Sequence, residues 1–199
     1  MKTRFENKED FANFKSEIRS RLNKHKFRHI DSTGLKPSAV NILFLDKDGE
    51  LHVFLTKRST NLTHHKGQIA FPGGRFEETD ASLLETAMRE TFEEAGIEHG
   101  AIEHLGRFDD FVAVSGYHAA CFVGAMEYPY EYKPRQGEVD ECFEVPMRIF
   151  INKEYSETES AAVANKIVTV YHYPYMGKDI WGLTARILTD FACKIITDG

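Results

Sequence analysis

The 199-residue chain has few of the features that mark membrane, secreted or nucleic-acid-binding proteins. No stretch approaches the roughly 18 consecutive apolar residues that a membrane-spanning helix needs. The charged segment from Met1 to Asp10 lacks the apolar core of a signal peptide. We therefore expect a soluble, cytoplasmic protein with no membrane partner.

Cysteine is also scarce, and negative charge outweighs positive charge. The three cysteines, Cys121, Cys142 and Cys193, form no CxxC pair and stand among apolar neighbours, which is typical of thiols in a reducing compartment. The formal net charge of -6 gives no broad attraction to a nucleic-acid backbone, so we expect no polymeric nucleic-acid partner. Repeats, low-complexity tracts and long linkers are missing, which favours one domain with elaborations.

Apolar spacing along the chain predicts an α/β protein with an α/β/α sandwich around a mixed β-sheet. Residues 1–34 contain an amphipathic helix and a lead-in, which we expect to pack on a domain formed by residues 35–199; the alternative is a helix that binds a partner. Residues 46–49 read DKDG and predict a hairpin turn. We expect helices near 11–24, 82–96 and 184–196, and strands at 39–45, 51–57, 102–108, 117–126 and 167–173.

Three glutamates on the predicted middle helix carry the strongest chemical signal. Glu90, Glu93 and Glu94 stand at positions i, i+3 and i+4, so their carboxylates project from one side. Helical geometry puts Glu94 at the border of the apolar face, where a partly buried carboxylate needs a cation. Hard cations such as Mg²⁺ prefer oxygen ligands. The alternative is a solvated acidic face with ordinary ion pairs to Arg89.

The segment before this helix suits phosphate binding. A short apolar run at residues 68–71 breaks at Pro72-Gly73-Gly74, and Ser82 and Glu85 then stand in the spacing of a capping box. A strand, a Gly-Gly turn and a helix start bring backbone N–H groups close to one another. Such an arrangement can hold phosphate groups beside a bound metal.

Residues 74–97 resemble the Nudix box. Residues 89–97 read RETFEEAGI and match the end of its pattern, REUxEExGU, in which U is an aliphatic or aromatic residue. Upstream the match departs from the pattern, because Asp80 stands where a glutamate is usual and eight residues rather than seven separate it from Arg89. This spacing resembles the coenzyme A pyrophosphatase branch, and we assign Asp80 no role.

A second motif resembles the signature of the same branch, LLTxRS...LxxHxGQxxFPGG. Residues 55–59 read LTKRS, Leu62 and His65 follow, and residues 67–74 read GQIAFPGG. Residues 138–146 and 181–185 are similar to two further stretches of the branch, EVxExFxVP and WGxTA. The resemblance therefore extends over most of the chain after residue 54.

The resemblance implies a Nudix fold and a hydrolase that requires Mg²⁺ or Mn²⁺ and acts on a small-molecule nucleotide. The branch implies cleavage of coenzyme A or its derivatives into 4'-phosphopantetheine, or its acyl form, and adenosine 3',5'-bisphosphate. One alternative is another Nudix activity, on ADP-ribose, a nucleotide sugar or a dinucleoside polyphosphate; another is a nucleotide-binding module without catalysis. The oligomeric state stays open, a homodimer included.

The resemblance also implies roles for individual residues. Glu90, Glu93 and Glu94 carry over as metal ligands, and Arg89 as the arginine that orients a metal-binding glutamate. Its alternative is a surface ion pair with Glu93. Related enzymes recruit a general base from a later loop, for which Glu138 and Glu141 are candidates unless they simply face solvent.

The remaining candidates concern substrate binding. We expect Lys57 and Arg58 to meet the substrate's phosphates, and His65 to position the loop or the substrate. Gly73 or Gly74 supplies the tight turn and, in the fuller interpretation, a backbone carbonyl to the metal. The alternatives are surface cations, a loop-packing histidine and turn geometry alone.

Overall fold

The computed structural model describes residues 1–63, 65–163 and 166–197. Its largest element is a mixed β-sheet whose described strands are β1 (Lys36–Lys47), β2 (Glu50–Arg58), β3 (Ile69–Ala70), β4 (Gly73–Arg75), β5 (Ile102–Arg107), β6 (Phe111–Val112), β7 (Tyr117–Met126) and β8 (Val139–Pro146). The central order is β3-β2-β1-β7-β5, and β8, β4 and β6 pair with β2, β1 and β7 respectively. β1 and β7 run parallel, whereas the other pairs are antiparallel.

Helices and a smaller sheet complete the fold. The helices are α1 (Lys8–His25), α2 (Leu83–Ala95), α3 (Arg148–Ile151) and α4 (Gly182–Phe191), with a 3-10 turn at His99–Ala101 and a π-helical turn at Ala192–Ile196. The second sheet has the order β11-β10-β9, formed by β9 (Glu157–Val163), β10 (Lys166–Tyr175) and β11 (Lys178–Trp181). No helix in the described ranges has both the length and the apolar character needed to cross a membrane.

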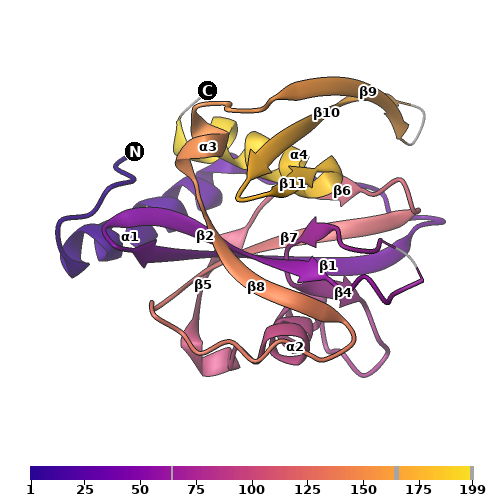
Figure 1. The fold of residues 1–199 in the computed structure, drawn as a ribbon, viewed down its shortest axis with the longest axis horizontal. Helices are drawn as coiled ribbons and strands as arrows, with labels where there is room; N and C mark the ends of the chain where they lie inside the picture. The colour runs from indigo at the N-terminus through magenta and orange to yellow at the C-terminus, as the bar shows by residue number, and fades with distance from the viewer. Residues whose placement is uncertain (64, 164–165, 198–199) are drawn as a thin grey trace.

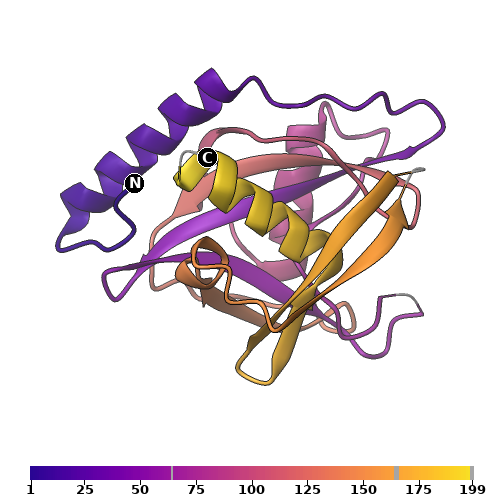
Figure 2. The same ribbon diagram turned by 90° about the horizontal axis from the view of Figure 1, so that it is seen from above.

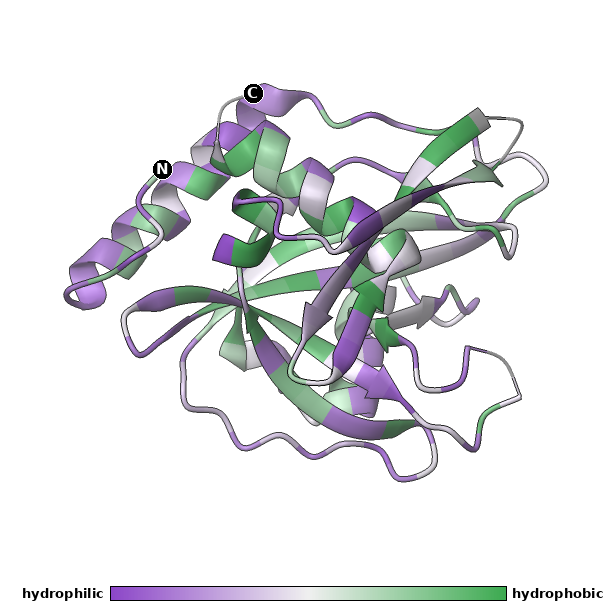
Figure 3. Ribbon diagram, turned by 45° about the horizontal axis from the view of Figure 1, so that its top comes forward, coloured by the Kyte–Doolittle hydropathy of each residue, from purple (hydrophilic) through white to green (hydrophobic). Residues whose placement is uncertain are grey.

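The elements form three layers, which confirms the predicted α/β/α sandwich around a mixed sheet. α2 covers one face of the large sheet, while α4 and the second sheet lie over the other (Figure 1). Seen from above, α4 crosses the sheet and α1 lies along one side (Figure 2). The strands of the sheet are largely hydrophobic, whereas α1 is mostly hydrophilic on its outer surface (Figure 3).

The first helix buries its apolar stripe on the same core as α4. Its buried residues are those expected from the sequence: Phe11, Phe14, Ile18 and Leu22. The Phe14 ring meets the Phe44 ring of β1 edge-on, with centroids 6.0 Å apart. On the outside, Lys15 and Arg19 pair with Glu103. The apolar face of α1 is therefore buried against other residues of the same chain.

The predicted hairpin is confirmed and the strand count is larger than expected. Asp48 and Gly49 both have positive φ, 54° and 78°, in the two-residue turn between β1 and β2, the conformation that favours Asp-Gly in hairpins. Strands β4, β6, β8, β9 and β11 were not predicted, and Gly73 and Gly74, expected in a tight turn, belong to β4. β9 is largely exposed and polar, so it lacks the alternation that marks a half-buried strand.

Candidate active site

Helix α2 is positioned by its two ends and by small residues on its inner face. The Ser82 hydroxyl accepts the Glu85 N–H at the start, and Gly96, with φ of 68°, donates its N–H to the Phe92 carbonyl at the end. The predicted capping box is incomplete, because the Glu85 carboxylate accepts the N–H of Ala81 rather than that of Ser82. Three buried alanines let the helix approach the sheet closely: Ala39, Ala87 and Ala120.

Glu94 lies on the buried side of the helix, only 4% exposed. Its carboxylate accepts the Gly73 N–H at 3.3 Å and lies 3.6 Å from an Arg58 guanidinium nitrogen. Burial raises the pKa of Glu94 to about 8, against the opposing effects of Arg58 and the Gly73 N–H. A carboxyl group with this much desolvation gains strongly from a cation beside it.

Gly74 lets the β4 strand approach Glu90 closely. A Cβ atom at Gly74 would collide with the Glu90 carboxylate, so that a glycine is required for the present contact. Burial also raises the pKa of Glu90, although Arg89 opposes the shift. Glu90 and Glu94 therefore lie side by side along Gly73 and Gly74 of β4.

Gly73 is required by the backbone itself. Its φ is 156°, and a Cβ atom would collide with the Ala39 carbonyl oxygen and lie 2.7 Å from the Val40 Cα. We expect Gly73→Ala to destabilise the fold by about 2 kcal/mol or more. Gly74→Ala should instead fold normally and lose about 10²-fold in kcat/KM, because only the Glu90 side chain must move.

The two glycine variants form a matched pair. Thermal unfolding and kcat/KM measured side by side separate a folding role from a role at the site. Full activity of Gly74→Ala would show that the Glu90 position is not needed for turnover.

Arg89 is held by Asp80, to which the sequence assigned no role. The Asp80 carboxylate accepts from Arg89 Nε at 2.8 Å and Nη2 at 3.1 Å, and from the Thr86 hydroxyl at 2.8 Å. Arg89 holds the pKa of the buried Asp80 carboxyl well below its usual range. Fixed in this way, Arg89 donates to Glu90 at 3.1 Å and reaches Glu93 at 3.4 Å. It thus bridges Asp80 and two of the glutamates.

Arg135, from the loop before β8, also enters this cluster and was missed by sequence reasoning. It donates to Glu93 at 3.1 Å and lies 3.4 Å from Glu138. Burial is the main cause of the raised pKa of Glu90 and of Glu94, and the negative charge of Glu138 adds to it. The only sequence signal for Arg135 is its position three residues before Glu138.

Two predicted site residues lie on the other face of the sheet. Glu141 is opposite Lys57 in the β8–β2 pairing and forms an ion pair with Lys178 of β11 at 3.0 Å. The Lys178 ammonium also lies over the Phe143 ring, which packs in the core cluster away from α2. Since side chains alternate along a strand, Arg58 faces Glu94 while Lys57 faces β11. The structure does not bring Lys57 or Glu141 to the glutamate helix.

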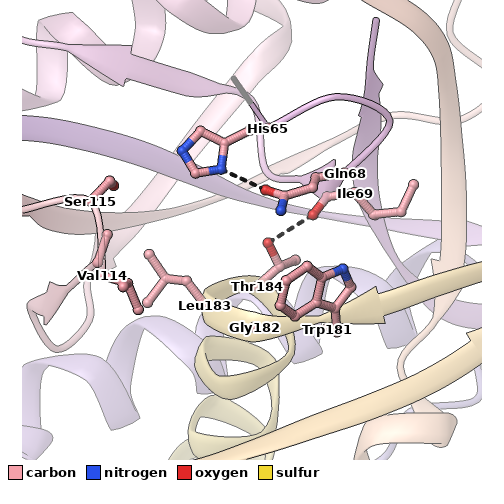
Figure 4. A pocket seen from close by; sticks show the side chains of 10 residues that line it. His65, Gln68, Ile69, Val114, Ser115, Trp181, Gly182, Leu183 and Thr184 are labelled. Atoms are coloured by element: carbon pink, nitrogen blue, oxygen red, sulfur yellow. Dashed lines mark hydrogen bonds between the residues drawn. The ribbon is translucent and has the colours of Figure 1, made fainter. Parts of the chain in front are cut away.

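A cleft begins beside Gly73 and Gly74 of β4. A cavity of about 360 Å³ is lined by Arg58, His65, Gln68, Gly73 and Gly74, among others. It continues into an apolar groove of about 290 Å³, in which Val114 and Leu183 lie across from His65 and Gln68 (Figure 4). His65 Nδ1 and the Gln68 side-chain oxygen are 2.8 Å apart, and this contact fixes both side chains at the junction.

The donor set fits a divalent cation. Glu90 and Glu94 offer hard oxygen ligands, and burial raises the pKa of each. In the part of the chain that is described, no three acidic, histidine or cysteine side chains already converge as a ready metal cage. Instead Glu93 is held by Arg89 and Arg135, and Glu94 lies beside Arg58. The arginines balance the carboxylates in this arrangement.

Comparison with known proteins identifies the family. The NUDIX domain family model matches residues 35–163, more than half of the chain. This chain belongs to the Nudix family. A Nudix hydrolase of Pectobacterium atrosepticum, NudL, is 35% identical over 72% of this chain and 74% of its own length. Escherichia coli NudL is 29% identical over 94% of both chains.

A plant relative and a solved structure extend the comparison. The mitochondrial Nudix hydrolase 15 of Arabidopsis thaliana is 32% identical over 77% of this chain. The match covers 56% of the length of the plant protein. The Nudix domain of Shewanella oneidensis NrtR, solved with ADP-ribose, aligns at 22% identity over 59% of this chain and 77% of its own, with a TM-score of 0.48.

Membership of the Nudix family shows the general activity of this chain. This Nudix protein is a pyrophosphohydrolase that acts on nucleotide-derived small molecules, and enzymes of the family generally use divalent cations. Its fold is the Nudix fold.

Proposed function

We propose that this Nudix enzyme hydrolyses the diphosphate linkage of coenzyme A or its derivatives with Mg²⁺ or Mn²⁺. The products are 4'-phosphopantetheine, or its acyl form, and adenosine 3',5'-bisphosphate. The observation that carries the proposal is that the second sequence motif lines the cleft. Arg58, His65 and Gln68 all belong to that motif, and all face the same cavity as Gly73 and Gly74.

The glutamate cluster supports a role in holding the metal. Glu90, Glu93 and Glu94 are the ligands that we propose, with Arg89 positioning Glu90 and Glu93 from its anchor on Asp80. When bound, the cation neutralises charge on the diphosphate and makes water more nucleophilic. Arg58 lies where it can donate to a phosphate oxygen placed beside Gly73 and Gly74.

The chemical step is hydrolysis at one phosphorus. The oxygen of a water molecule bonds to that phosphorus, the bridging P–O bond breaks, and the leaving phosphate keeps the bridging oxygen and its electron pair. The water gives up a proton to a general base. Glu138 suits this task because Arg135 links it to Glu93 and because it is only partly exposed.

Glu138 and Glu141 can be compared directly because their side chains are equally exposed, at 43% each. We expect Glu138→Gln to lower kcat by about 10²-fold or more at saturating metal and substrate, since a positioned base contributes that much. Glu141→Gln should keep kcat within about twofold, because Glu141 pairs with Lys178 on the other face. Single-turnover rates check both. Equal losses in the two variants would refute the assignment of the base to Glu138.

The proposed reaction is tested by identifying its products. Purified protein with Mg²⁺ or Mn²⁺ should convert coenzyme A into equal amounts of 4'-phosphopantetheine and adenosine 3',5'-bisphosphate, resolved by chromatography and mass spectrometry. An exposed glutamate near the end of α2 offers a control, because Glu98→Gln leaves every residue of the cluster in place. Coenzyme A left intact by an enzyme that cleaves another nucleotide would overturn the proposal.

A further inference from the structure

The two adjacent basic residues at the end of β2 are divided between two cavities. Arg58 lines the cleft with Gly73 and Gly74. Lys57 lines a separate cavity of about 320 Å³ between β3 and the β10–β11 turn. Two further lysines line this second cavity, Lys66 and Lys178, and we call it the lysine pocket.

The lysine pocket is positively charged in a protein whose net charge is -6. Its one acidic lining residue, Asp179, is engaged by His172 at 2.7 Å, and this contact raises the pKa of His172. Lys178 pairs with the partly exposed Glu141, while Lys57 and Lys66 form no ion pair with any residue that the structure describes. The Lys178 side chain is only 17% exposed, and Glu141 already neutralises its charge. The ammonium groups of Lys57 and Lys66 are therefore the ones that can meet an anion.

The lysine pocket adjoins the cleft through shared walls. Gln68 lines the cleft, the apolar groove and the lysine pocket alike. Ile69 and Trp181 separate the apolar groove from the lysine pocket and belong to both. A ligand whose diphosphate lies in the cleft beside Arg58 can therefore place a second anionic group among the lysines, with its apolar part against Trp181 or Leu183.

We propose that the lysine pocket binds a phosphate monoester carried by the substrate at a distance from the cleaved diphosphate. The inference rests on the proposed function, since the 3'-phosphate of the coenzyme A ribose is such a group. A phosphate monoester carries a charge of about -1.5 to -2 at pH 7 and accepts charge-assisted hydrogen bonds from ammonium groups. ADP-ribose and nucleotide sugars lack this group. The pocket thus distinguishes coenzyme A from other diphosphate substrates.

Dephospho-coenzyme A tests the inference because it differs from coenzyme A only in that phosphate. The wild-type enzyme should show a kcat/KM for coenzyme A about tenfold or more above that for dephospho-coenzyme A. In a Lys57→Ala, Lys66→Ala double variant, which leaves the Lys178–Glu141 pair intact, the ratio should fall toward one. Lys24→Ala, an exposed lysine on α1, is the matched control and should keep the wild-type ratio.

Product inhibition gives an independent reading of the same pocket. Adenosine 3',5'-bisphosphate should inhibit the wild-type enzyme at concentrations about tenfold or more below those of AMP, and the double variant should lose the difference. Equal kcat/KM for the two coenzymes in the wild type would overturn the lysine pocket and leave the proposed function standing. Hydrolysis of neither coenzyme, with turnover of ADP-ribose, would overturn both. If the double variant keeps the wild-type ratio of kcat/KM values, the lysine pocket is not the phosphate site.

Discussion

Glu94→Gln is expected to lower kcat/KM by on the order of 10³-fold while the protein stays folded. The substitution keeps the shape of the side chain but removes the negative charge of a buried, proposed metal ligand beside Gly73. Glu93→Gln should give a loss of the same kind, although Glu93 is more exposed and is also held by Arg135. Steady-state assays at matched, saturating metal concentration measure both, with Glu98→Gln as the control that leaves the cluster intact.

Glu94→Gln should increase the stability of the metal-free protein, although it lowers activity. In the metal-free protein the pKa of Glu94 rises from 4.5 to about 8, so the folded state keeps a proton that the unfolded state releases. Wild-type stability therefore falls as pH rises from about 4.5 to 8, and Glu94→Gln escapes this loss. At pH 7 the metal-free variant should be more stable by on the order of 3 kcal/mol.

Urea unfolding in the presence of a chelator checks the sign. The stability difference should shrink as the pH falls toward 4.5 and vanish below it, where Glu94 is protonated in both the folded and the unfolded wild type. Normal turnover in Glu94→Gln and Glu93→Gln would contradict the assignment of these glutamates to the metal. A variant less stable than wild type at every pH would contradict the burial argument for Glu94.

Asp80→Asn is expected to weaken both the fold and the reaction. The change breaks the two-point contact with Arg89, a pair in which Asp80 is almost fully buried and Arg89 largely so. The loss of stability at pH 7 should be about 2 to 3 kcal/mol, because an arginine is left without its buried partner. Released from Asp80, Arg89 no longer positions Glu90 and Glu93, and kcat/KM should fall by about 10- to 100-fold.

The stability loss has a defined pH dependence. The pKa of Asp80 is depressed in the folded protein, so its contribution is present above about pH 4 and is lost as pH falls further. Wild type and Asp80→Asn should therefore converge in acid. Glu78→Gln, an exposed neighbour in the same loop, is the control. A variant with normal kcat/KM would show that Arg89 needs no anchor.

The elements that the sequence predicted well depend on local rules. The helix from Ser82 to Gly96 follows from a capping serine, a C-terminal glycine and an apolar face. The hairpin at Asp48-Gly49 follows from its turn chemistry. The position of Glu94 at the border of the core also followed from helical spacing, and its burial in the structure agrees with that expectation.

The features that were missed depend on contacts between distant segments. Asp80 reaches Arg89 only because the loop before α2 folds back along the helix, and Arg135 reaches Glu93 from 42 residues away. The separation of Lys57 from Arg58, and of Glu138 from Glu141, is set by the register of β8 on β2, which shifts between Lys57 and Arg58. Register across an unpredicted strand cannot be read from one sequence.

The central claim is that this Nudix enzyme cleaves coenzyme A, and a comparison of specificity constants tests it most directly. Purified protein with Mg²⁺ or Mn²⁺ would be assayed on coenzyme A, acetyl-coenzyme A, ADP-ribose and a nucleotide sugar. The highest kcat/KM should belong to a coenzyme, with adenosine 3',5'-bisphosphate as a product. A higher kcat/KM for ADP-ribose or the nucleotide sugar would keep the fold and the metal helix but contradict the substrate.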